Sequence, residues 1–389
     1  MSDQTAFTET EERVALRAAV RELAARYGRE YFTRKARAGE KTTELWAEAG
    51  KLGYLGVAVP ELYGGGGGGI GDLAAVCEEF AASGCPMLMM VVSPAICATV
   101  IARFGTEQQR AHWLPGFADG TTKMAFAITE PEAGSNSHKL ATSVRRDGDE
   151  WVVSGGKYFI SGVDEADAVL VVARHRDAEG NLGLPSLMIV PTDAPGFTFQ
   201  PIEMDIVSPE RQFTLFFDEV RLPADALVGS TDAGLAQAFA GLNPERIMAA
   251  SFSTGIARYA LERATEYVRT RSVWGQPVGA HQGVAHPLAQ CAIQLELARL
   301  MTQKAAASYD SGDDRAAGEA ANMAKYAAAE AAADTVDAAV QSHGGNGLAS
   351  EYGLGTLLAA SRVGRIAPVS REMILNYVAQ HTLKLPKSY

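Results

Sequence analysis

The sequence has 389 residues, of which 47% are hydrophobic and 21% are charged, a profile typical of a globular protein with two or three domains. The formal net charge of −11 argues against a nucleic-acid partner, because such a partner normally requires a basic face. The most apolar window, residues 87–102, is shorter than a bilayer span and contains Ser93-Pro94. We expect a buried helix there and no association with a membrane.

The N-terminal stretch MSDQTAFTETEER is polar and acidic, unlike a secretory signal or an Arg-rich transit peptide. The four cysteines form no C-x-x-C pair, so reduced thiols in the cytoplasm are the simplest interpretation. The seven histidines predict no metal site, because His281 and His286 are five residues apart and miss the i, i+4 spacing of a helical ligand pair. The cysteines are Cys77, Cys85, Cys97 and Cys291.

Residues 1–120 are predicted to form an N-terminal helical domain. The glycine run at 63–69 is predicted to be a loop, because glycine is costly to order and has no side chain to pack. It contains a formal G-x-G-x-x-G pattern, but no strand precedes it, so it is not interpreted as a dinucleotide site. The helical spacing covers residues 9–38, 41–52, 72–103 and 107–118.

Residues 121–229 are rich in β-branched and aromatic residues between turn signals. This pattern predicts a central antiparallel β domain, either a sandwich or a barrel. The predicted strands are 123–129, 150–155, 157–161, 168–174, 186–192 and 212–220.

Residues 230–389 return to a helical period and predict a C-terminal bundle, which completes an α+β multidomain fold. Ile293, Leu297, Leu300 and Met301 fall on one stripe, as expected for packing within the bundle. A very Ala-rich segment that ends in HGGNG (343–347) predicts closely packed helices and a glycine stop. The predicted helices are 234–241, 244–272, 283–310, 313–342 and 369–383.

The stretch LNPERIMAA (242–250) contains a carboxylate that can be interpreted in two ways. Asn243 is predicted to cap a helix whose first residue is Pro244, which places Glu245 in the first turn. An acid at that position is favoured by the helix dipole by about 0.3–1 kcal/mol. Alone, this stretch favours a structural role for Glu245 over a catalytic one.

A polar loop, AITEPEAGSN (127–136), follows the first predicted strand and offers backbone N–H groups and hydroxyls to a polar cofactor. This loop resembles the flavin-binding signature of the acyl-CoA dehydrogenase family. Four more stretches resemble the motifs of that family, in the same order along the chain. They are GGKYFIS (155–161), the helix and loop at 245–282, QSHGGNG (341–347) and RIAPVSREMI (365–374).

The resemblance implies FAD, an acyl-CoA thioester substrate, and a homotetramer or dimer. It assigns one set of residues to the flavin ring and a second set to the adenosine and pyrophosphate of a neighbouring subunit's FAD. It also assigns Ser370, in the closing motif, to cofactor binding. Ser135 and Arg246 are also expected beside the substrate. The flavin set is Phe126, Ile128, Thr129, Gly134, Ser135, Phe159 and Ser161, and the second set is Arg271, Trp274, Gln282, Gln341, Gly344 and Gly345.

The family's reaction removes an α-proton from the thioester while a hydride passes to flavin N5, which leaves a trans-2-enoyl-CoA. Most members carry the proton-accepting carboxylate in the closing motif, where this chain has Pro368. Long-chain and isovaleryl types carry it in the first bundle helix instead, and the matching residue here is Glu245. The resemblance therefore favours Glu245 as the catalytic base, with Glu372 as the weaker alternative.

Pro368 raises a second question, because in the family a backbone N–H at this position helps to polarise the thioester carbonyl and proline has no N–H. The alternatives are a one-residue shift to Val369, a flavin hydroxyl acting alone, or different chemistry. The leading function is an acyl-CoA dehydrogenase of fatty acid metabolism that passes electrons to an electron-transfer flavoprotein. Related oxidases, enoyl-CoA reductases and monooxygenases, and a non-catalytic flavin-binding subunit, remain open, as does any role for the divergent segment 204–217.

Overall fold

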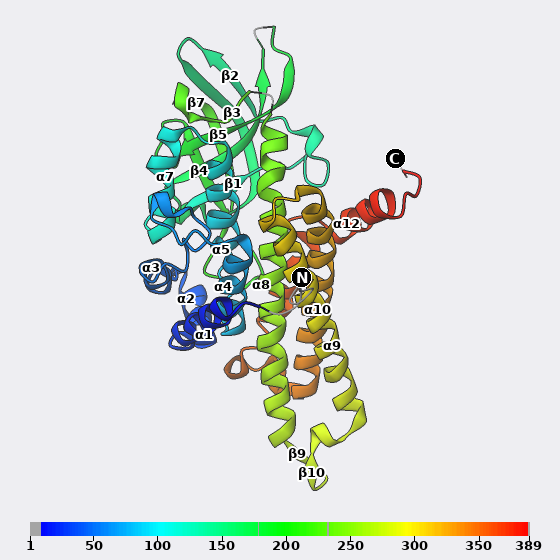
Figure 1. The fold of residues 1–389 in the computed structure, drawn as a ribbon. Coiled ribbons are helices and arrows are strands. Elements are labelled where there is room, and N and C mark those ends of the chain that lie inside the picture. The colour runs from blue at the N-terminus through cyan, green and yellow to red at the C-terminus, as the bar shows by residue number, and fades with distance from the viewer. Residues whose placement is uncertain (1–8, 178, 232, 388–389) are drawn as a thin grey trace.

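The computed structural model describes residues 9–177, 179–231 and 233–387, apart from the side chains of residues 235, 236 and 239. The first eight residues of the polar N-terminal stretch lie outside this description. Helices, a sheet and a second group of helices follow one another along the chain, as predicted (Figure 1). The long helix α8, Gly234–Thr270, runs beside both the sheet and the bundle. None of the described helices is long and apolar enough to cross a bilayer.

The N-terminal part is helical, but the predicted segments divide into shorter helices. The predicted 72–103 segment breaks at Gly84, which adopts a positive φ of 92°. The apolar window is buried as predicted, and a π-helical turn, η2 at Ser93–Ala98, carries Pro94. The helices are α1 Glu11–Ala25, α2 Gly28–Ala38, α3 Thr43–Lys51, α4 Ile70–Ala82, α5 Met89–Val92, α6 Thr99–Phe104 and α7 Glu107–Asp119.

The central strands form a single sheet in the order β6-β7-β3-β2-β4-β5-β8, with β1 beside β4. Most pairs are antiparallel as predicted, but β4 pairs in parallel with both β1 and β2. The two predicted strands at 150–155 and 157–161 are one strand, and β2, β6 and β8 were not predicted. The bounds are β1 Met124–Ala127, β2 Ser143–Asp147, β3 Glu150–Ser161, β4 Ala168–Arg176, β5 Leu182–Pro191, β6 Phe197–Ile202, β7 Gln212–Pro223 and β8 Leu227–Val228.

Strand β1 is buried on both faces, which explains its uninterrupted apolar sequence. Ala125 and Ala127 belong to the core enclosed by the sheet. Met124 and Phe126 belong to a second core that the sheet shares with α4, η2, α8 and α10. The loop after β1 therefore emerges where the sheet meets both groups of helices.

The C-terminal part is a bundle in which α10 packs against α8 and α9. The predicted start of a helix at Asn243 and Pro244 is wrong, because α8 is continuous from Gly234 and contains Pro244 in its interior. The packing of α8 against α4, η2 and β5 stabilises the helical conformation on both sides of Pro244. The remaining elements are β9 Ser272–Val273, β10 Gln276–Pro277, α9 Gln282–Asp310, α10 Asp314–His343, α11 Leu357–Ile366, α12 Arg371–Tyr377 and the π-helical η9 Val378–Thr382.

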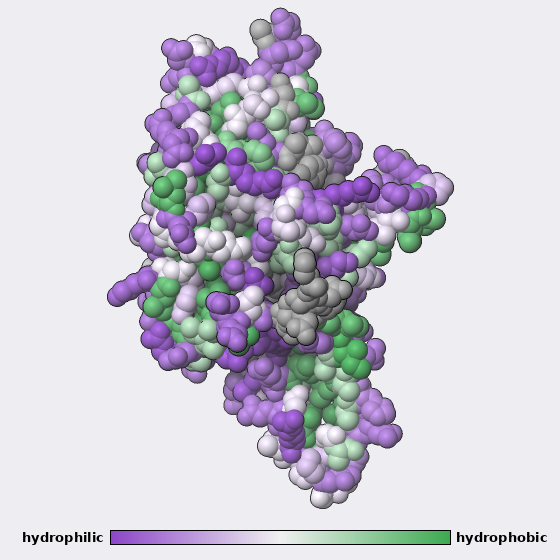
Figure 2. Space-filling model, viewed as in Figure 1, coloured by the Kyte–Doolittle hydropathy of each residue, from purple (hydrophilic) through white to green (hydrophobic). Residues whose placement is uncertain are grey.

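Only part of the predicted apolar stripe on α9 packs within this chain: Met301 contacts the core, but the other end of the stripe is exposed. Ile293 is 64% exposed and Leu297 is 61% exposed. The buried face of α9 is instead formed by Cys291, Leu295 and Ala298. Figure 2 shows apolar side chains gathered on the lower half of the bundle, over α9.

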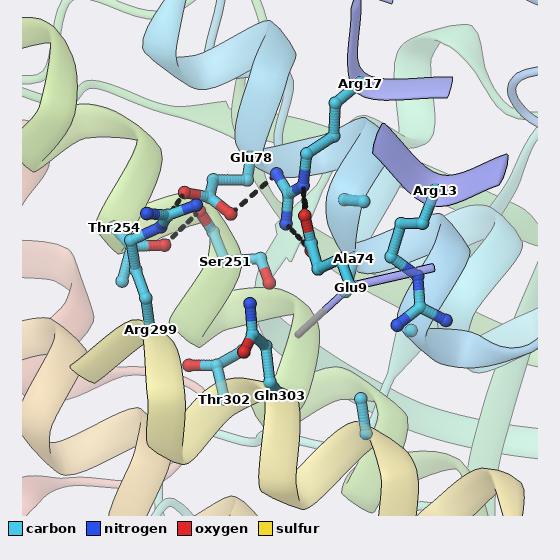
Figure 3. A pocket seen from close by; sticks show the side chains of 13 residues that line it. Glu9, Arg13, Arg17, Ala74, Glu78, Ser251, Thr254, Arg299, Thr302 and Gln303 are labelled. Atoms are coloured by element: carbon cyan, nitrogen blue, oxygen red, sulfur yellow. Dashed lines mark hydrogen bonds and ion pairs between the residues drawn. The ribbon is translucent and has the colours of Figure 1, made fainter. Parts of the chain in front are cut away.

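A buried group of ion pairs joins the N-terminal helices to the bundle (Figure 3). Arg17 contacts both Glu78 at 2.9 Å and Glu79 at 3.0 Å, and Arg258 contacts the same two carboxylates. Arg299 reaches Glu78 from α9 at 2.8 Å. The adjoining cavity, about 20 Å³, is large enough for about one water molecule, so this pocket connects helices and is too small for a substrate.

Replacing Glu79 by Gln should lower the free energy of unfolding by about 3–5 kcal/mol, because the change removes one of the two carboxylates that Arg17 and Arg258 share and leaves buried positive charge in excess. Burial alone would raise the pKa of Glu79, but Arg258, Arg21 and Arg17 lower it to about 2. The wild type should therefore hold this stability above about pH 4.5 and lose it as the pH falls toward 2. Denaturant titrations at several pH values measure both effects. Glu296→Gln, in an exposed pair with Arg299, is the matched control and should be nearly neutral.

Candidate active site

Glu245 lies in the interior of α8, two turns or more from the helix start. Its carboxylate therefore gains nothing from the helix N-terminus, and the structural interpretation offered by the sequence is wrong. Burial raises the pKa of Glu245 to about 7, against the opposing charges of Arg246 and Lys325. A carboxylate with this pKa can accept a proton near neutral pH.

Two buried cations lie beside Glu245. Arg246 donates from Nη1 to the Asn243 side chain at 3.1 Å, and its Nε has no hydrogen-bond partner among the described residues. Lys325, from α10, donates to the carbonyl of Val369. Burial lowers the pKa of both cations, that of Lys325 to about 8.

Cys97 connects this group to the sheet. Its thiol lies 3.7 Å from the Met124 carbonyl and 3.6 Å from the Ala125 carbonyl, both in β1. The charge of Glu245 also raises the pKa of Cys97, in addition to the larger effect of burial, so the two side chains are close. Cys97 therefore neighbours both Glu245 and β1, the strand that leads into the predicted flavin loop.

The predicted flavin loop lies beside β3. The Tyr158 N–H donates to the Thr129 carbonyl at 2.9 Å, which joins the loop to the strand that carries Phe159. Gly134 and Ser135 are exposed, and a side chain at Gly134 would meet no atom within 4 Å. Ser161 donates to Gln212 at 3.0 Å. The structure thus brings Thr129 and Phe159 to one edge and leaves the backbone at Gly134 open to a ligand.

A buried ion pair fixes this loop, and the sequence did not indicate it. The Lys157 ammonium donates to Glu130 at 2.8 Å and to the Ile128 carbonyl at 2.9 Å. Glu130 also accepts from the N–H groups of Ala141 and Thr142. Lys157 is fully buried, so the loop is held at both ends by charged hydrogen bonds.

Two of the predicted aromatic cofactor residues have backbone φ angles in the left-handed region. Phe159 has a φ of 57° and is 48% exposed, and Trp274 has a φ of 53° and is 89% exposed. Bulky residues rarely adopt this left-handed region, and such strain is concentrated at ligand sites. The aromatic side chains are therefore available to a ligand instead of to the core.

The second predicted set lies at the other end of α8. Tyr267, one turn before Arg271, stacks on His343 with ring centroids 4.1 Å apart. Asn346 donates to the Tyr267 hydroxyl, so the 341–347 segment packs beside the end of α8. The exposed members of this group are Arg271, Trp274, Gln282, Gln341, Gly344 and Gly345.

About 37 Å of helix separates Glu245 from the end of α8 at Thr270. The two predicted sets therefore do not form one site within a single chain (Figure 1). Ser370 lies in the first group, because its hydroxyl caps α12 through Met373 N–H next to Val369 and Lys325. Glu372, the alternative base, is 73% exposed and lies beside Arg371, whereas Glu245 is half-buried and burial raises its pKa.

The divergent segment 204–217 contains Glu210, whose carboxylate accepts from the Leu88 N–H at 3.0 Å and from the Ser208 hydroxyl at 2.8 Å. Burial raises the pKa of Glu210 to about 7. The segment thus joins the sheet to the chain entering α5. Among the described residues, no cluster of His, Cys, Asp and Glu could hold a metal ion.

Comparison with known proteins agrees with this three-part architecture. The acyl-CoA dehydrogenase N-terminal, middle and C-terminal domains match residues 10–121, 125–220 and 232–383. Acyl-CoA dehydrogenase FadE12 of Mycobacterium tuberculosis is 63% identical over 385 residues, 99% of each chain. The chain belongs to the acyl-CoA dehydrogenase family, whose members are flavin-dependent oxidoreductases that bind FAD.

Solved structures share the fold. Butyryl-CoA dehydrogenase of Megasphaera elsdenii has a TM-score of 0.91 at 28% identity, covering 97% of this chain and 99% of that one. A glutaryl-CoA dehydrogenase of Mycobacterium smegmatis in complex with FADH2 has a TM-score of 0.90 at 26% identity, covering 98% and 96%. The family and the three-part fold implied by the sequence motifs are confirmed.

Replacing Lys157 by Met should weaken FAD binding by about tenfold or more, because a charged hydrogen bond contributes about 1.5–3 kcal/mol. The change releases the Ile128 carbonyl and leaves Glu130 buried without its cation. Fluorescence titration of flavin-stripped protein with FAD measures the affinity. Lys139→Met removes an exposed lysine from the segment that follows this loop and should bind FAD as the wild type does. Equal affinity for the two variants would show that the buried pair does not organise the flavin loop.

Proposed function

We propose that this protein removes the α-proton of an acyl-CoA thioester with Glu245 and converts the substrate to a trans-2-enoyl-CoA. One observation carries the proposal: Glu245 is a carboxylate with a pKa raised to about 7 that neighbours Cys97, whose thiol contacts the carbonyls of β1, the strand before the flavin loop. Glu372 is exposed, and Pro368 supplies no acid at the position that most family members use. When bound, FAD supplies the hydride acceptor.

The exposed groups support the FAD contacts. The open backbone at Gly134 and Ser135 offers N–H groups to the flavin ring, and the exposed face of Phe159 is available to cover it. At the other end of α8, the exposed Arg271 guanidinium suits a pyrophosphate, because its planar fork pairs with phosphate oxygens. Trp274 and the open Gly344–Gly345 backbone would lie around the same part of the cofactor. The remaining predicted contacts are Phe126, Ile128, Thr129, Ser161, Gln282, Gln341 and Ser370.

Substrate contacts follow from the same geometry. Ser135 lies exposed on the flavin loop, where it can donate to the thioester. Arg246 is largely buried beside Glu245, and its Nε has no hydrogen-bond partner in the described parts of the chain, so it can place positive charge near the developing enolate. Pro368 cannot donate a hydrogen bond to the carbonyl, and Val369 carries the next N–H along this turn.

Assembly from several copies of this chain would complete the site. The FAD contacts at the two ends of α8 are too far apart for one cofactor, so a second copy would supply the adenosine end. The exposed apolar face of α9, with Ile293 and Leu297, provides a surface that such an assembly would bury. A homotetramer, or at least a dimer, is therefore part of the proposal.

The electron acceptor and the compartment complete the proposed role. We expect an electron-transfer flavoprotein to reoxidise the flavin, as the family resemblance implies. The bacterial relatives and the four buried, unpaired cysteines support a cytoplasmic location. Hydrogen peroxide formed in air at the rate of substrate turnover would indicate an oxidase instead.

Glu245→Gln should abolish anaerobic bleaching of the flavin by acyl-CoA, with a loss of at least about a hundredfold in rate, because a positioned base contributes about 10²–10⁴. In the wild type, the bleaching rate should rise with pH through about 7, since the ionised carboxylate accepts the proton. Stopped-flow absorbance with a panel of straight, branched and aromatic acyl-CoAs measures both. Glu372→Gln is the control and should keep the wild-type rate. Full turnover by Glu245→Gln would remove the proposed base.

The double variant Ile293→Asp, Leu297→Asp should dissociate the assembly and weaken FAD binding, because charges on this face oppose its burial. Analytical ultracentrifugation at micromolar protein concentration reports the mass. Leu62→Asp changes a leucine that is 82% exposed in the N-terminal domain and should leave the mass unchanged. An unaltered mass for the double variant would mean that another surface joins the copies.

A further inference from the structure

Lys325 is a fully buried cation on α10 without an ion pair among the described residues. Its ammonium donates to the Val369 carbonyl, in the turn between α11 and α12. Burying an ammonium group costs several kcal/mol unless nearby charges and hydrogen bonds compensate. The position of Lys325 therefore requires an explanation from the groups around it.

The charged groups around Lys325 come from three helices. Glu245 and Arg246 face it from α8, Glu330 lies on its own helix, and Glu372 lies on α12. Glu330 is already paired with Arg365 at 2.8 Å, and Glu372 is exposed beside Arg371. Glu245 is the carboxylate in this group that has no ion pair among the described residues. The charge of Lys325 therefore acts chiefly on Glu245.

The hydrogen bond to Val369 has a second effect. Val369 lies between Pro368, at the position where most family members carry the base, and Ser370, which caps α12. By holding the Val369 carbonyl, Lys325 fixes the start of α12 against α10. Lys325 thus holds the turn that contains Pro368 through a hydrogen bond, and its charge acts on Glu245 of α8.

We propose that Lys325 is a positioning residue for proton abstraction: its hydrogen bond fixes the turn at 367–370 beside Glu245, and its positive charge favours the ionised form of the Glu245 carboxylate. This inference rests on the proposed role of Glu245 as the base. Lys325 does not exchange a proton with the substrate. It makes the carboxylate available at a lower pH than burial alone would allow.

The test compares three variants of the FAD-loaded protein. Lys325→Met removes the charge and the hydrogen bond, Lys325→Gln retains a donor without the charge, and Lys325→Arg retains the charge. The readout is the pH dependence of anaerobic flavin reduction, with the straight-chain acyl-CoA, from butyryl-CoA to palmitoyl-CoA, that bleaches the wild-type flavin fastest. FAD content and thermal melting are measured in parallel, and Lys304→Met, an exposed lysine on α9, is the control.

The acid limb of the rate profile is the pH range in which flavin reduction slows as Glu245 becomes protonated. It should move to higher pH by roughly half a unit or more in Lys325→Met and Lys325→Gln, because a cation near Glu245 has been removed. Lys325→Arg should restore the limb toward the wild-type position, and Lys304→Met should leave it unchanged. If Lys325→Met does not bind FAD, the pH dependence of flavin reduction in Lys325→Gln provides the test. An unshifted limb in the FAD-loaded Lys325→Gln overturns the inference.

The inference and the proposed function fail in different ways. Full turnover by Glu245→Gln would remove Glu245 as the base, and the inference with it. An inactive Glu245→Gln together with an unshifted limb in the Lys325 variants would reject only the role of Lys325. A purely structural lysine would change melting and FAD content without moving the limb.

Discussion

The chemistry proposed for this protein depends on a half-buried carboxylate that has two cations beside it. Partial burial raises the pKa of Glu245, and the charges of Arg246 and Lys325 limit the rise. A fully solvated glutamate would be too weak a base, and an isolated buried one would stay protonated. The arrangement requires contributions from α8, α10 and the N-terminal helices together, so the site exists only when these parts are packed.

The length of helix α8 sets the distance between Glu245 and the second group of predicted cofactor residues. The N-terminal part of the helix packs against β5 of the sheet and contains Glu245, and the other end leads into the exposed group around Arg271. Because the helix is rigid and long, the two groups cannot approach each other within one chain. Under the proposed assembly, a second copy of the chain would account for both the exposed apolar face of α9 and the second group of predicted cofactor residues. Assembly and cofactor binding would then be coupled.

The sequence predicted the order of helices, sheet and bundle, because long amphipathic and β-branched segments determine it. It failed where local signals and tertiary packing disagree. Asn243-Pro244 resembles a helix start, yet packing carries α8 through it. Strand β2, with the sequence SVRRD, is too polar to show a strand pattern and is stabilised by pairing with β3 and β4.

The candidate site was predicted in part. The assignments of the flavin loop, the β3 aromatic and Glu245 came from motifs that resemble those of the family, and they stay predictions. The buried lysines were missed, since Lys157 contacts Glu130 and Lys325 contacts Val369 only through the folded structure. Periodicity also could not distinguish the inner face of α9 from its outer face, since apolar residues occupy both. Such contacts become visible only when distant segments are brought together.

The most direct test of the central claim is a crystal structure of the FAD-loaded protein with an acyl-CoA analogue that cannot be oxidised, such as a 3-thia-acyl-CoA. The measured quantity is the distance from the Glu245 carboxylate oxygens to the α-carbon of the thioester. A distance of about 3–4 Å, with the carboxylate on the face of the α-carbon opposite the flavin, is the result that we expect. A Glu245 carboxylate that points away from the thioester, with another acid beside the α-carbon, would contradict the account.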